Sequence, residues 1–197
     1  MTRVLAWDRE ALRAGAEQVL DVYAEAMGVP RALAGSRRSI LSTHLDREGL
    51  RTVAALEPGG RLVGVAYGHL GARGQWWHDR VWSALVDSLG RPAAADWMRG
   101  SFEVCELHVR PAQQGTGLGR ELLDALLEGP AGRTALLTTP DSETRARGFY
   151  RAGGWVDLVR RLRFPGDPRE FAVLGLRLPT GAGSRSTAPA ADLGSLR

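Results

Sequence analysis

Residues 102–111 read FEVCELHVRP, and residues 113–123, which follow almost at once, read QQGTGLGRELL. The first segment predicts a β-strand, because its apolar residues suit a pleated surface and Pro111 cannot donate to a ladder. The second opens a predicted helix, because leucines recur at helical spacing over residues 118–127. Three glycines at alternate positions, Gly115, Gly117 and Gly119, lie between the strand and the helix. The rest of the chain is organised around this strand–loop–helix unit.

The alternating glycines predict an anion site. The first turn of a helix presents N–H groups without internal partners and a partial positive charge, and glycines let the backbone approach an anion closely. Arg120 would add a charged donor. A tight turn alone would need only one or two glycines. The loop is not a Walker loop, because no Gly-Lys-Ser/Thr follows, and it departs from G-x-G-x-x-G because position 120 is arginine.

The remaining segments alternate between helical and strand patterns. The expected elements are helices over residues 8–27 and 30–45, a hairpin over 50–57 and 61–70, a Trp-rich helical segment within 71–101, a strand over 134–138, a helix over 143–152 and a second hairpin over 155–164 and 171–178. A strand–helix–strand crossover predicts that strand 134–138 pairs in parallel with strand 102–109. A first strand would have to come from residues 2–7. We expect one domain over residues 1–179 and a disordered tail over 180–197.

Composition narrows the class of protein. The 197 residues are 44% hydrophobic and 24% charged, which is typical of a globular domain. Acidic residues interrupt residues 1–27, so we expect neither a signal peptide nor a membrane span there, and the cytoplasm is the expected location. The single cysteine, Cys105, excludes an internal disulfide and is expected to be a buried small hydrophobe. The four histidines show no ligand spacing, so no metal is expected.

The net charge of +4 and the sequence pI of about 10.1 come from arginine alone, because the chain contains no lysine. A basic balance favours anionic ligands. Nucleic acid is not expected, because the arginines are spread among acidic residues rather than gathered in one tract. The pair Arg37 and Arg38 is interpreted as part of a solvated helix face.

Residues 114–119 match the pattern Q/R-x-x-G-x-G/A, and LHVRP precedes them at residues 107–111. In this order the strand, loop and leucine helix resemble the acetyl-coenzyme A signature of the GNAT superfamily of N-acetyltransferases. The resemblance implies an α/β fold of the α+β type, with a central mixed sheet flanked by helices, and makes 71–101 a helical insertion before the central strand. It assigns acetyl-coenzyme A binding to Leu107, His108, Val109, Gln114, Gly115, Thr116, Gly117, Leu118, Gly119 and Arg120.

The resemblance also implies direct attack of an acceptor amine on the thioester, without a covalent acyl-enzyme. An alkyl ammonium with a pKa of about 10.4 needs a base before it can attack. The candidates on the central strand are Glu103, Glu106 and His108. The resemblance to histone acetyltransferases favours Glu103; a solvated carboxylate or a water-relayed base are the alternatives. Strict alternation would place Glu103 with Cys105 and Leu107, opposite Glu106 and His108.

Residues 148–155, GFYRAGGW, resemble the family's F/L-Y-x-x-x-G-F segment. The match implies that Tyr150 is the acid that protonates the leaving thiolate; a half-buried helix tyrosine is the alternative. One position departs from the family, because Glu143 occurs where members often carry an asparagine that contacts the coenzyme. A carboxylate there would be poorly placed near phosphates.

The expected function is transfer of acetyl from acetyl-coenzyme A to a primary amine of a small molecule, peptide or protein. The alternatives are a catalytically inactive acyl-coenzyme A-binding sensor or interaction module and, in third place, an anion- or nucleic-acid-binding protein. The acceptor pocket is expected to draw on the 30–45 helix, the Trp-rich segment and the 164–171 turn. The tryptophans of that segment either fill the core or a dimer interface, or line the acceptor pocket. The sequence leaves open whether the chain forms a homodimer.

Overall fold

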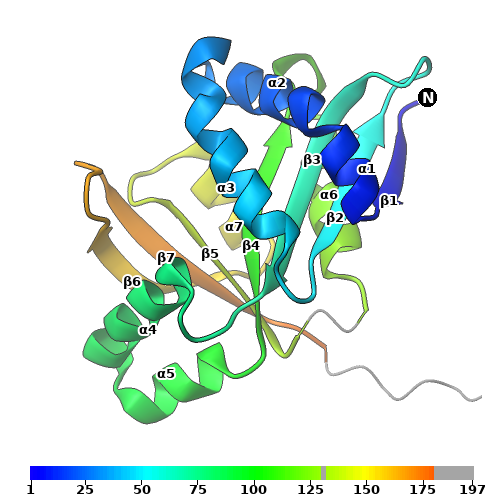
Figure 1. The fold of residues 1–197 in the computed structure, drawn as a ribbon. Coiled ribbons are helices and arrows are strands. Elements are labelled where there is room, and N and C mark those ends of the chain that lie inside the picture. The colour runs from blue at the N-terminus through cyan, green and yellow to red at the C-terminus, as the bar shows by residue number, and fades with distance from the viewer. Residues whose placement is uncertain (130–131, 180–197) are drawn as a thin grey trace, which may run out of the picture.

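The computed structural model describes residues 1–129 and 132–179, the side chains of residues 33 and 36 excepted. One mixed sheet runs through it in the order β1-β2-β3-β4-β5-β7-β6 (Figure 1). The strands are β1 (Arg3–Trp7), β2 (Arg51–Leu56), β3 (Leu62–Leu70), β4 (Ser101–Val109), β5 (Thr134–Pro140), β6 (Val156–Arg163) and β7 (Glu170–Arg177). The mixed sheet flanked by helices confirms the predicted fold class. The tail expected to be disordered lies outside the described residues.

Helices connect these strands along the chain. They are α1 (Arg9–Ala14), α2 (Ala16–Met27), α3 (Gly35–Leu45), α4 (Trp76–Leu89), α5 (Arg91–Met98), α6 (Leu118–Leu127) and α7 (Arg145–Ala152), with single 3₁₀ turns η1 (Arg31–Ala34) and η2 (Pro111–Gln113). No described helix is both long enough and apolar enough to cross a membrane.

Three helix boundaries differ from the sequence prediction, and one of them is the start of α3, which begins at Gly35 after η1 rather than at residue 30. The helix expected over residues 8–27 divides at Gly15, where a Cβ atom would lie 2.5 Å from the Trp7 ring, so the indole occupies the space that a larger residue would need. Asp8 caps α1 as predicted, with Oδ1 accepting from the Ala11 N–H at 2.8 Å. Helix α7 begins two residues later than expected, because Thr144 is its N-cap and its hydroxyl accepts from the Arg147 N–H at 3.1 Å.

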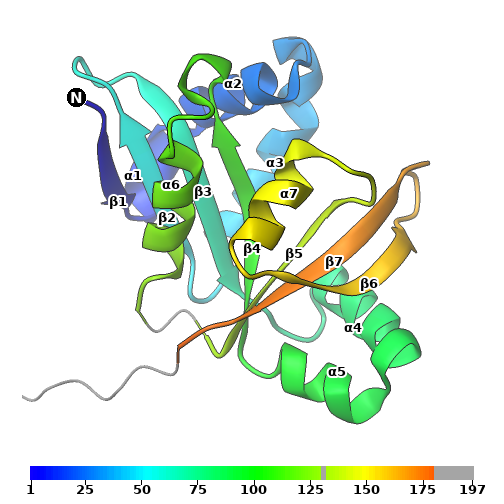
Figure 2. The same cartoon turned by 180° about the vertical axis from the view of Figure 1, so that it is seen from behind.

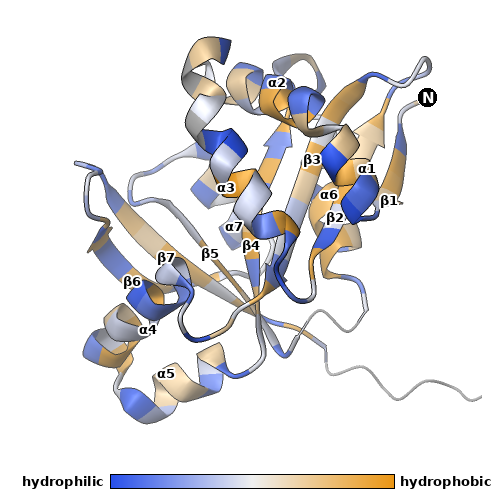
Figure 3. Cartoon of the chain, viewed as in Figure 1, coloured by the Kyte–Doolittle hydropathy of each residue, from blue (hydrophilic) through white to orange (hydrophobic). Residues whose placement is uncertain are grey.

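The helices divide between the two faces of the sheet. Helix α6 and the aromatic residues of α7 pack on one face, where Leu122 and Leu126 of α6 are fully buried. Helices α1, α2 and α3 cover β2 and β3 on the other face, and α4 and α5 cover the β5-β7-β6 end of it. Burial of each large apolar side chain contributes about 1.5–3 kcal/mol. Figure 3 shows β3 and β7, both inside the sheet, as largely hydrophobic.

Strands β4 and β5 pair in parallel, as predicted, but only over three residue pairs. Ser101, Phe102 and Glu103 pair with Thr134, Ala135 and Leu136, and beyond this point no pairing joins the two strands. The strands then diverge, and α7 lies over the opening between them (Figure 2). The sheet therefore has a gap in its hydrogen bonding beside the second half of β4.

A β-bulge at Cys105 changes which residues of β4 share a face. Tyr67 of β3 pairs with Glu106 and its neighbour Gly68 pairs with Val104, so Cys105 is the extra residue. Val104 and Leu107 consequently pack in the same cluster as α6. The prediction that Glu106 and His108 lie opposite Glu103 is wrong, because strict alternation assumes an unbroken register. All three candidate bases lie on the face covered by α2 and α3.

Candidate functional site

A groove of about 480 Å³ lies where β4 and β5 diverge, and most of the residues predicted to bind the coenzyme line it. These residues are Leu107, His108, Val109, Gln114, Gly115, Gly117, Gly119 and Arg120. Two of the predicted residues are directed elsewhere. Leu118 is buried in the core under α6, and the Thr116 hydroxyl donates to the Gln113 carbonyl at 2.8 Å.

The loop before α6 has the backbone shape that an anion site needs. Gly115 has φ +80° and Gly117 has φ +93°, a left-handed conformation that glycine adopts without steric cost. Gly117 is the N-cap of α6, and no described side chain caps this helix end. No described atom lies within 4 Å of the position that a Gly117 Cβ would take. The first turn of α6 thus presents its N–H groups toward the groove edge.

Two guanidinium groups flank this loop, and the sequence interpretation identified only one of them. The Arg120 guanidinium lies 5.0 Å from the centre of the Phe149 ring and lines the groove. Arg145, at the start of α7, also lines it and donates from Nη1 to Gln114 Oε1 at 3.4 Å. Arg145 was missed because α7 is brought against the loop only by the fold. The pair supplies positive charge where a phosphate-bearing ligand would need it.

Glu143 does not face the groove. Its side chain is 81% exposed and pairs with Arg151 at 3.5 Å and Arg147 at 3.8 Å. The guanidinium groups of α7 therefore draw this carboxylate away from the groove, and the expected conflict between Glu143 and a phosphate does not arise among the described contacts.

Tyr150 projects from α7 into the groove. Its ring packs edge-on against Phe149 and Trp155, with centroid distances of 5.1 and 5.5 Å. Burial, together with the nearby Glu106 carboxylate, raises the pKa of Tyr150 well above its usual range. The phenol therefore keeps its proton at neutral and alkaline pH, as a proton donor must.

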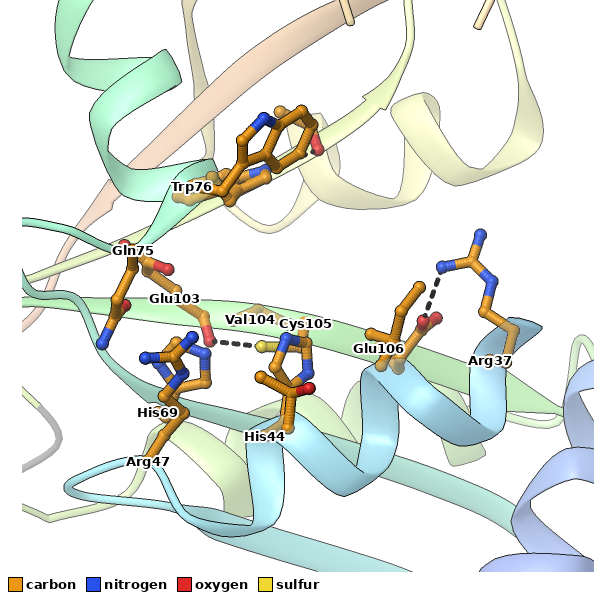
Figure 4. A pocket seen from close by; sticks show the side chains of 14 residues that line it. Arg37, His44, Arg47, His69, Gln75, Trp76, Glu103, Val104, Cys105 and Glu106 are labelled. Atoms are coloured by element: carbon orange, nitrogen blue, oxygen red, sulfur yellow. Dashed lines mark hydrogen bonds and ion pairs between the residues drawn. The ribbon is translucent and has the colours of Figure 1, made fainter. Parts of the chain in front are cut away.

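A separate cavity of about 360 Å³, here termed the first cavity, adjoins the first half of β4 (Figure 4). Its lining residues come from α3, the end of β3, the start of α4, β4 and β5. They include Arg37, His44, His69, Trp76, Trp77, Glu103, Cys105, Glu106 and Thr138. The 30–45 helix and the Trp-rich segment, both expected at an acceptor pocket, line this cavity, and no residue of the 164–171 turn does. Phe164 only packs its ring against Trp76 at 5.4 Å.

Glu103 is buried at this cavity with one strong partner. His78 Nδ1 lies 2.9 Å from Glu103 Oε1, and the two side chains are 7% and 5% exposed. Gly71 closes over the pair, because a Cβ there would lie 2.4 Å from Glu103 Oε1. The position predicted for the base is therefore a carboxylate held by a histidine from α4, a contact that no sequence pattern indicated.

Glu106 joins the two cavities. Its Oε1 accepts from Arg37 at 3.1 Å, and its Oε2 lies 2.5 Å from Nε2 of His108, which lines the groove. Burial alone would raise the pKa of Glu106, but His108 and Arg37 outweigh it and hold the pKa below its usual value. The interpretation of Arg37 as solvated is wrong, since it binds Glu106 and lies 4.9 Å from the centre of the Tyr23 ring. Arg38 pairs with Glu17 at the surface.

The tryptophans of the Trp-rich segment divide between the two expected roles. Trp76 is 60% exposed at the cavity, and Trp77 donates from Nε1 to the Thr138 hydroxyl at 3.2 Å. Trp82 and Trp97 pack against the core cluster under α4 and α5, and Trp77 packs against it as well. Trp76 therefore lines the cavity, Trp82 and Trp97 pack against the core, and Trp77 does both.

Three potential metal-ligating side chains meet in the same cavity. One ligand atom each of His44, His69 and Cys105 lies within 4.8 Å of the others. Burial raises the pKa of the Cys105 thiol well above its usual range and, with the neighbouring His69, lowers the pKa of His44 to about 4. The expectation of no metal rested on spacing along the chain alone, and spacing cannot detect ligands that come from three separate elements.

Comparisons with known proteins agree with this geometry. Residues 16–154 match the model of the acetyltransferase (GNAT) family. Over 185 residues the chain is 38% identical to a GCN5-like protein acetyltransferase of Mycobacterium tuberculosis, covering 81% of this chain and 90% of that protein.

Solved structures share the fold at low sequence identity. A GNAT-family protein of Desulfovibrio desulfuricans superposes with a TM-score of 0.64 at 17% identity, covering 90% of this chain and 99% of its own. The ribosomal-protein-S18-alanine N-acetyltransferase of Escherichia coli gives 0.60 at 16% identity, with coverages of 94% and 98%. A protein of Salmonella typhimurium solved with its cofactor acetyl-CoA gives 0.56 at 16% identity, with coverages of 94% and 99%.

Proposed function

This chain belongs to the acetyltransferase (GNAT) family, and we propose that it transfers an acetyl group from acetyl-coenzyme A directly to a primary amine. Family membership makes it an acyltransferase with acetyl-coenzyme A as co-substrate. We further propose that residues 1–179 form one domain in which 71–101 is an insertion. Direct antiparallel pairing of β3 with β4, on either side of that segment, supports this division.

One observation carries the proposal: two cavities adjoin consecutive stretches of β4, at the point where β4 parts from β5. Residues 103–106 line the first cavity and residues 107–109 line the groove. The opening in the sheet begins directly after the Glu103–Leu136 pair. A thioester held in the groove would therefore be reachable by an amine held in the first cavity.

The groove fits acetyl-coenzyme A in shape and charge. The left-handed glycines and the first turn of α6 would hold the pyrophosphate, with Arg120 and Arg145 beside it. Leu107 and Val109 lie beyond the last β4–β5 pair, so their backbone could pair with the pantetheine arm as an added strand would. The Val109 carbonyl accepts from Gln114 Nε2 at 3.0 Å, and the coenzyme would have to displace that side chain to use it. When bound, the coenzyme supplies the acetyl group as a thioester.

Two side chains have the chemistry for the proton transfers. Glu103 would take a proton from the acceptor ammonium, with His78 orienting its carboxylate. The N–C bond forms, the C–S bond breaks, and Tyr150 would give its proton to the departing sulfur. Glu106 already accepts from both Arg37 and His108, so it is the less available base and is better suited to attracting an ammonium.

The first cavity suits an acceptor amine in its ammonium form, carried on a side chain or chain end that is exposed in the acceptor. Glu103 and Glu106 line this cavity together with Arg37 and Arg47, and Trp76 is exposed there. The carboxylates would attract an ammonium by charge, and the indole would add a cation–π contact. The relative from Mycobacterium tuberculosis is named a protein acetyltransferase, which supports a protein or peptide amine as acceptor.

The proposal is tested by incubating the protein with acetyl-coenzyme A and a panel of amines. The panel contains peptides with free N-termini, lysine peptides, polyamines and aminosugars; release of coenzyme thiol and product mass are measured. Because the chain lacks lysine, self-acetylation should add at most one acetyl group, at the N-terminus. Further additions would contradict this.

The variant Tyr150→Phe should lower kcat by about tenfold or more at every pH up to about 10, because the raised pKa keeps the phenol protonated throughout. Acetyl-coenzyme A binding without acetylation of any amine would instead favour an acyl-coenzyme A sensor. An unchanged kcat in Tyr150→Phe would remove Tyr150 as the acid.

A further inference from the structure

Three side chains from three elements converge at one end of the first cavity, and acetyl transfer as proposed above uses none of them. His44 lies in the last turn of α3, His69 near the end of β3 and Cys105 at the bulge of β4. All three line the cavity, and one ligand atom of each lies within 4.8 Å of the others (Figure 4). The bulge brings the thiol to this face.

The hydrogen bonds around the cluster leave one nitrogen of each histidine free. His69 Nδ1 lies 3.0 Å from the Leu70 carbonyl oxygen, and a proton on Nδ1 leaves the lone pair on Nε2. A backbone carbonyl that orients a histidine in this way is a common support for metal ligands. The buried Nδ1 of His44 has no hydrogen-bond partner among the described residues. A buried polar atom without a partner calls for an explanation.

A purely structural hydrogen-bond network does not explain the cluster. Within the described part of the chain, no hydrogen bond joins any two of the three side chains, and the Cys105 thiol donates to the Glu103 carbonyl at 3.5 Å. The two imidazole rings meet edge-on, with centroids 5.1 Å apart. Tetrahedral zinc bonds of about 2.0–2.3 Å place ligand atoms about 3.3–3.6 Å apart. Side-chain rotations that bring the atoms about 1 Å closer would therefore complete the site.

We propose that His44, His69 and Cys105 bind a thiophilic transition-metal ion of the Zn²⁺ type. Two imidazole nitrogens and one thiolate suit zinc and its neighbours and do not suit Mg²⁺ or Ca²⁺, which prefer oxygen ligands. Binding replaces the thiol proton with the metal and releases that proton to solvent. Three protein ligands leave one position for water or a further ligand from the cavity.

The metal and the acceptor amine would compete for one cavity. Glu103 and Glu106 line the same cavity as the three ligands, so a bound dication would repel an ammonium that these carboxylates attract. This consequence rests on the proposed function, whereas metal binding itself does not. Zinc should therefore raise the apparent KM for the acceptor and leave the KM for acetyl-coenzyme A unchanged.

The test uses the full chain freed of metals by a chelator. Titration with Co²⁺ should produce a thiolate-to-cobalt charge-transfer band that saturates at one ion per chain, and Zn²⁺ should displace it. Cys105→Ser should abolish the band, and His44→Gln should weaken binding by at least about tenfold. His108→Gln, on the same strand but outside the cluster, is the matched control and should keep the band.

Melting temperatures without metal establish that each variant is folded, and Cys105→Ala serves as a second thiol-free variant if Cys105→Ser is not. A missing charge-transfer band in the wild type would overturn the proposed site, as would a band that survives in a folded Cys105 variant. Zinc inhibition without these spectral changes would also contradict it. All these readouts hold whether or not the acetyl acceptor has been identified.

Discussion

The two halves of β4 adjoin two cavities that are built in different ways. Beside residues 107–109, five groove-lining residues come from the next dozen residues of the chain, and α7 supplies four more. Beside residues 103–106, the cavity lining comes from α3, β3, α4 and β5, elements that lie far apart in the sequence. The groove relies largely on backbone conformation, and the cavity relies on side chains.

This difference separates what the protein shares with its family from what is particular to it. A backbone cradle binds phosphates whatever the neighbouring side chains, so glycine positions are enough to specify it. A cavity made of side chains can change with each residue that lines it, so under the proposed function it would set the acceptor. Substitutions beside the first half of β4 should therefore affect turnover or acceptor binding, whereas substitutions beside the second half should affect coenzyme binding.

The largest expected effect is on turnover, and it comes from a substitution in the first half of β4. Glu103→Gln should lower kcat by about 10²–10⁴-fold, the usual contribution of a general base, and leave acetyl-coenzyme A binding intact. Glu106→Gln is the comparison, because it removes a carboxylate of the same cavity that accepts from Arg37 and His108. It should mainly raise the acceptor KM. Steady-state kinetics with both substrates varied distinguish the two, and a greater kcat loss in Glu106→Gln would assign the base to Glu106.

The next largest effect is on the affinity for the coenzyme, and it comes from a substitution in the groove beside the second half of β4. Gly117→Glu should weaken acetyl-coenzyme A binding by at least about 100-fold, because a like charge against phosphates costs several kcal/mol. Gly59→Glu is the matched control: its φ is +97° against +93° at Gly117, and both sites are open to solvent. Both variants should lose similar stability, about 1–2 kcal/mol, from left-handed strain.

Calorimetry and the ligand-induced shift in melting temperature measure this contrast. The shift should persist in Gly59→Glu and vanish in Gly117→Glu, because only a ligand that binds the folded state raises its stability. Equal binding in the two variants would mean that the α6 loop does not hold the coenzyme.

The smallest effect tests the division of the tryptophans. Trp76→Ala should raise the acceptor KM by about three- to tenfold, the loss expected from one cation–π contact, with little change in stability. Trp97→Ala removes a ring that packs in the core and should lower the free energy of unfolding by about 2–4 kcal/mol with the acceptor KM unchanged. Kinetics and chemical denaturation of both variants check this, and the reverse pattern would place Trp76 in a structural role.

Much of the groove could be predicted, for reasons visible in single residues. Gly115 and Gly117 stand where left-handed backbone is needed, and the leucines of α6 repeat at helical spacing. The Leu118 side chain packs in the core because it is the first inward residue of α6, so only its backbone could serve the predicted site. The prediction missed Arg145 because α7 reaches the loop only after β5 has returned the chain to the sheet. Hydrophobic periodicity within a segment predicts the helix or strand that it forms, but not which other elements pack against it.

The first cavity was largely hidden from the sequence. The faces of Glu106 and His108 were predicted wrongly, because the bulge at Cys105 arises from how β4 pairs with β3 and leaves no mark in the alternation of β4 itself. The His78 partner of Glu103 and the His44–His69–Cys105 cluster join residues separated by tens of positions. Such contacts depend on which elements pack together.

The sequence by itself determined the order of elements, the parallel crossover and the glycine loop, because these follow from periodicity, backbone freedom and short-range chain geometry. Only the tertiary structure decided which carboxylates share a face, which arginines flank the loop and which tryptophans line the cavity. Those choices depend on the pairing register and on packing between distant segments, where a shift of one residue moves a side chain to the opposite face of the sheet.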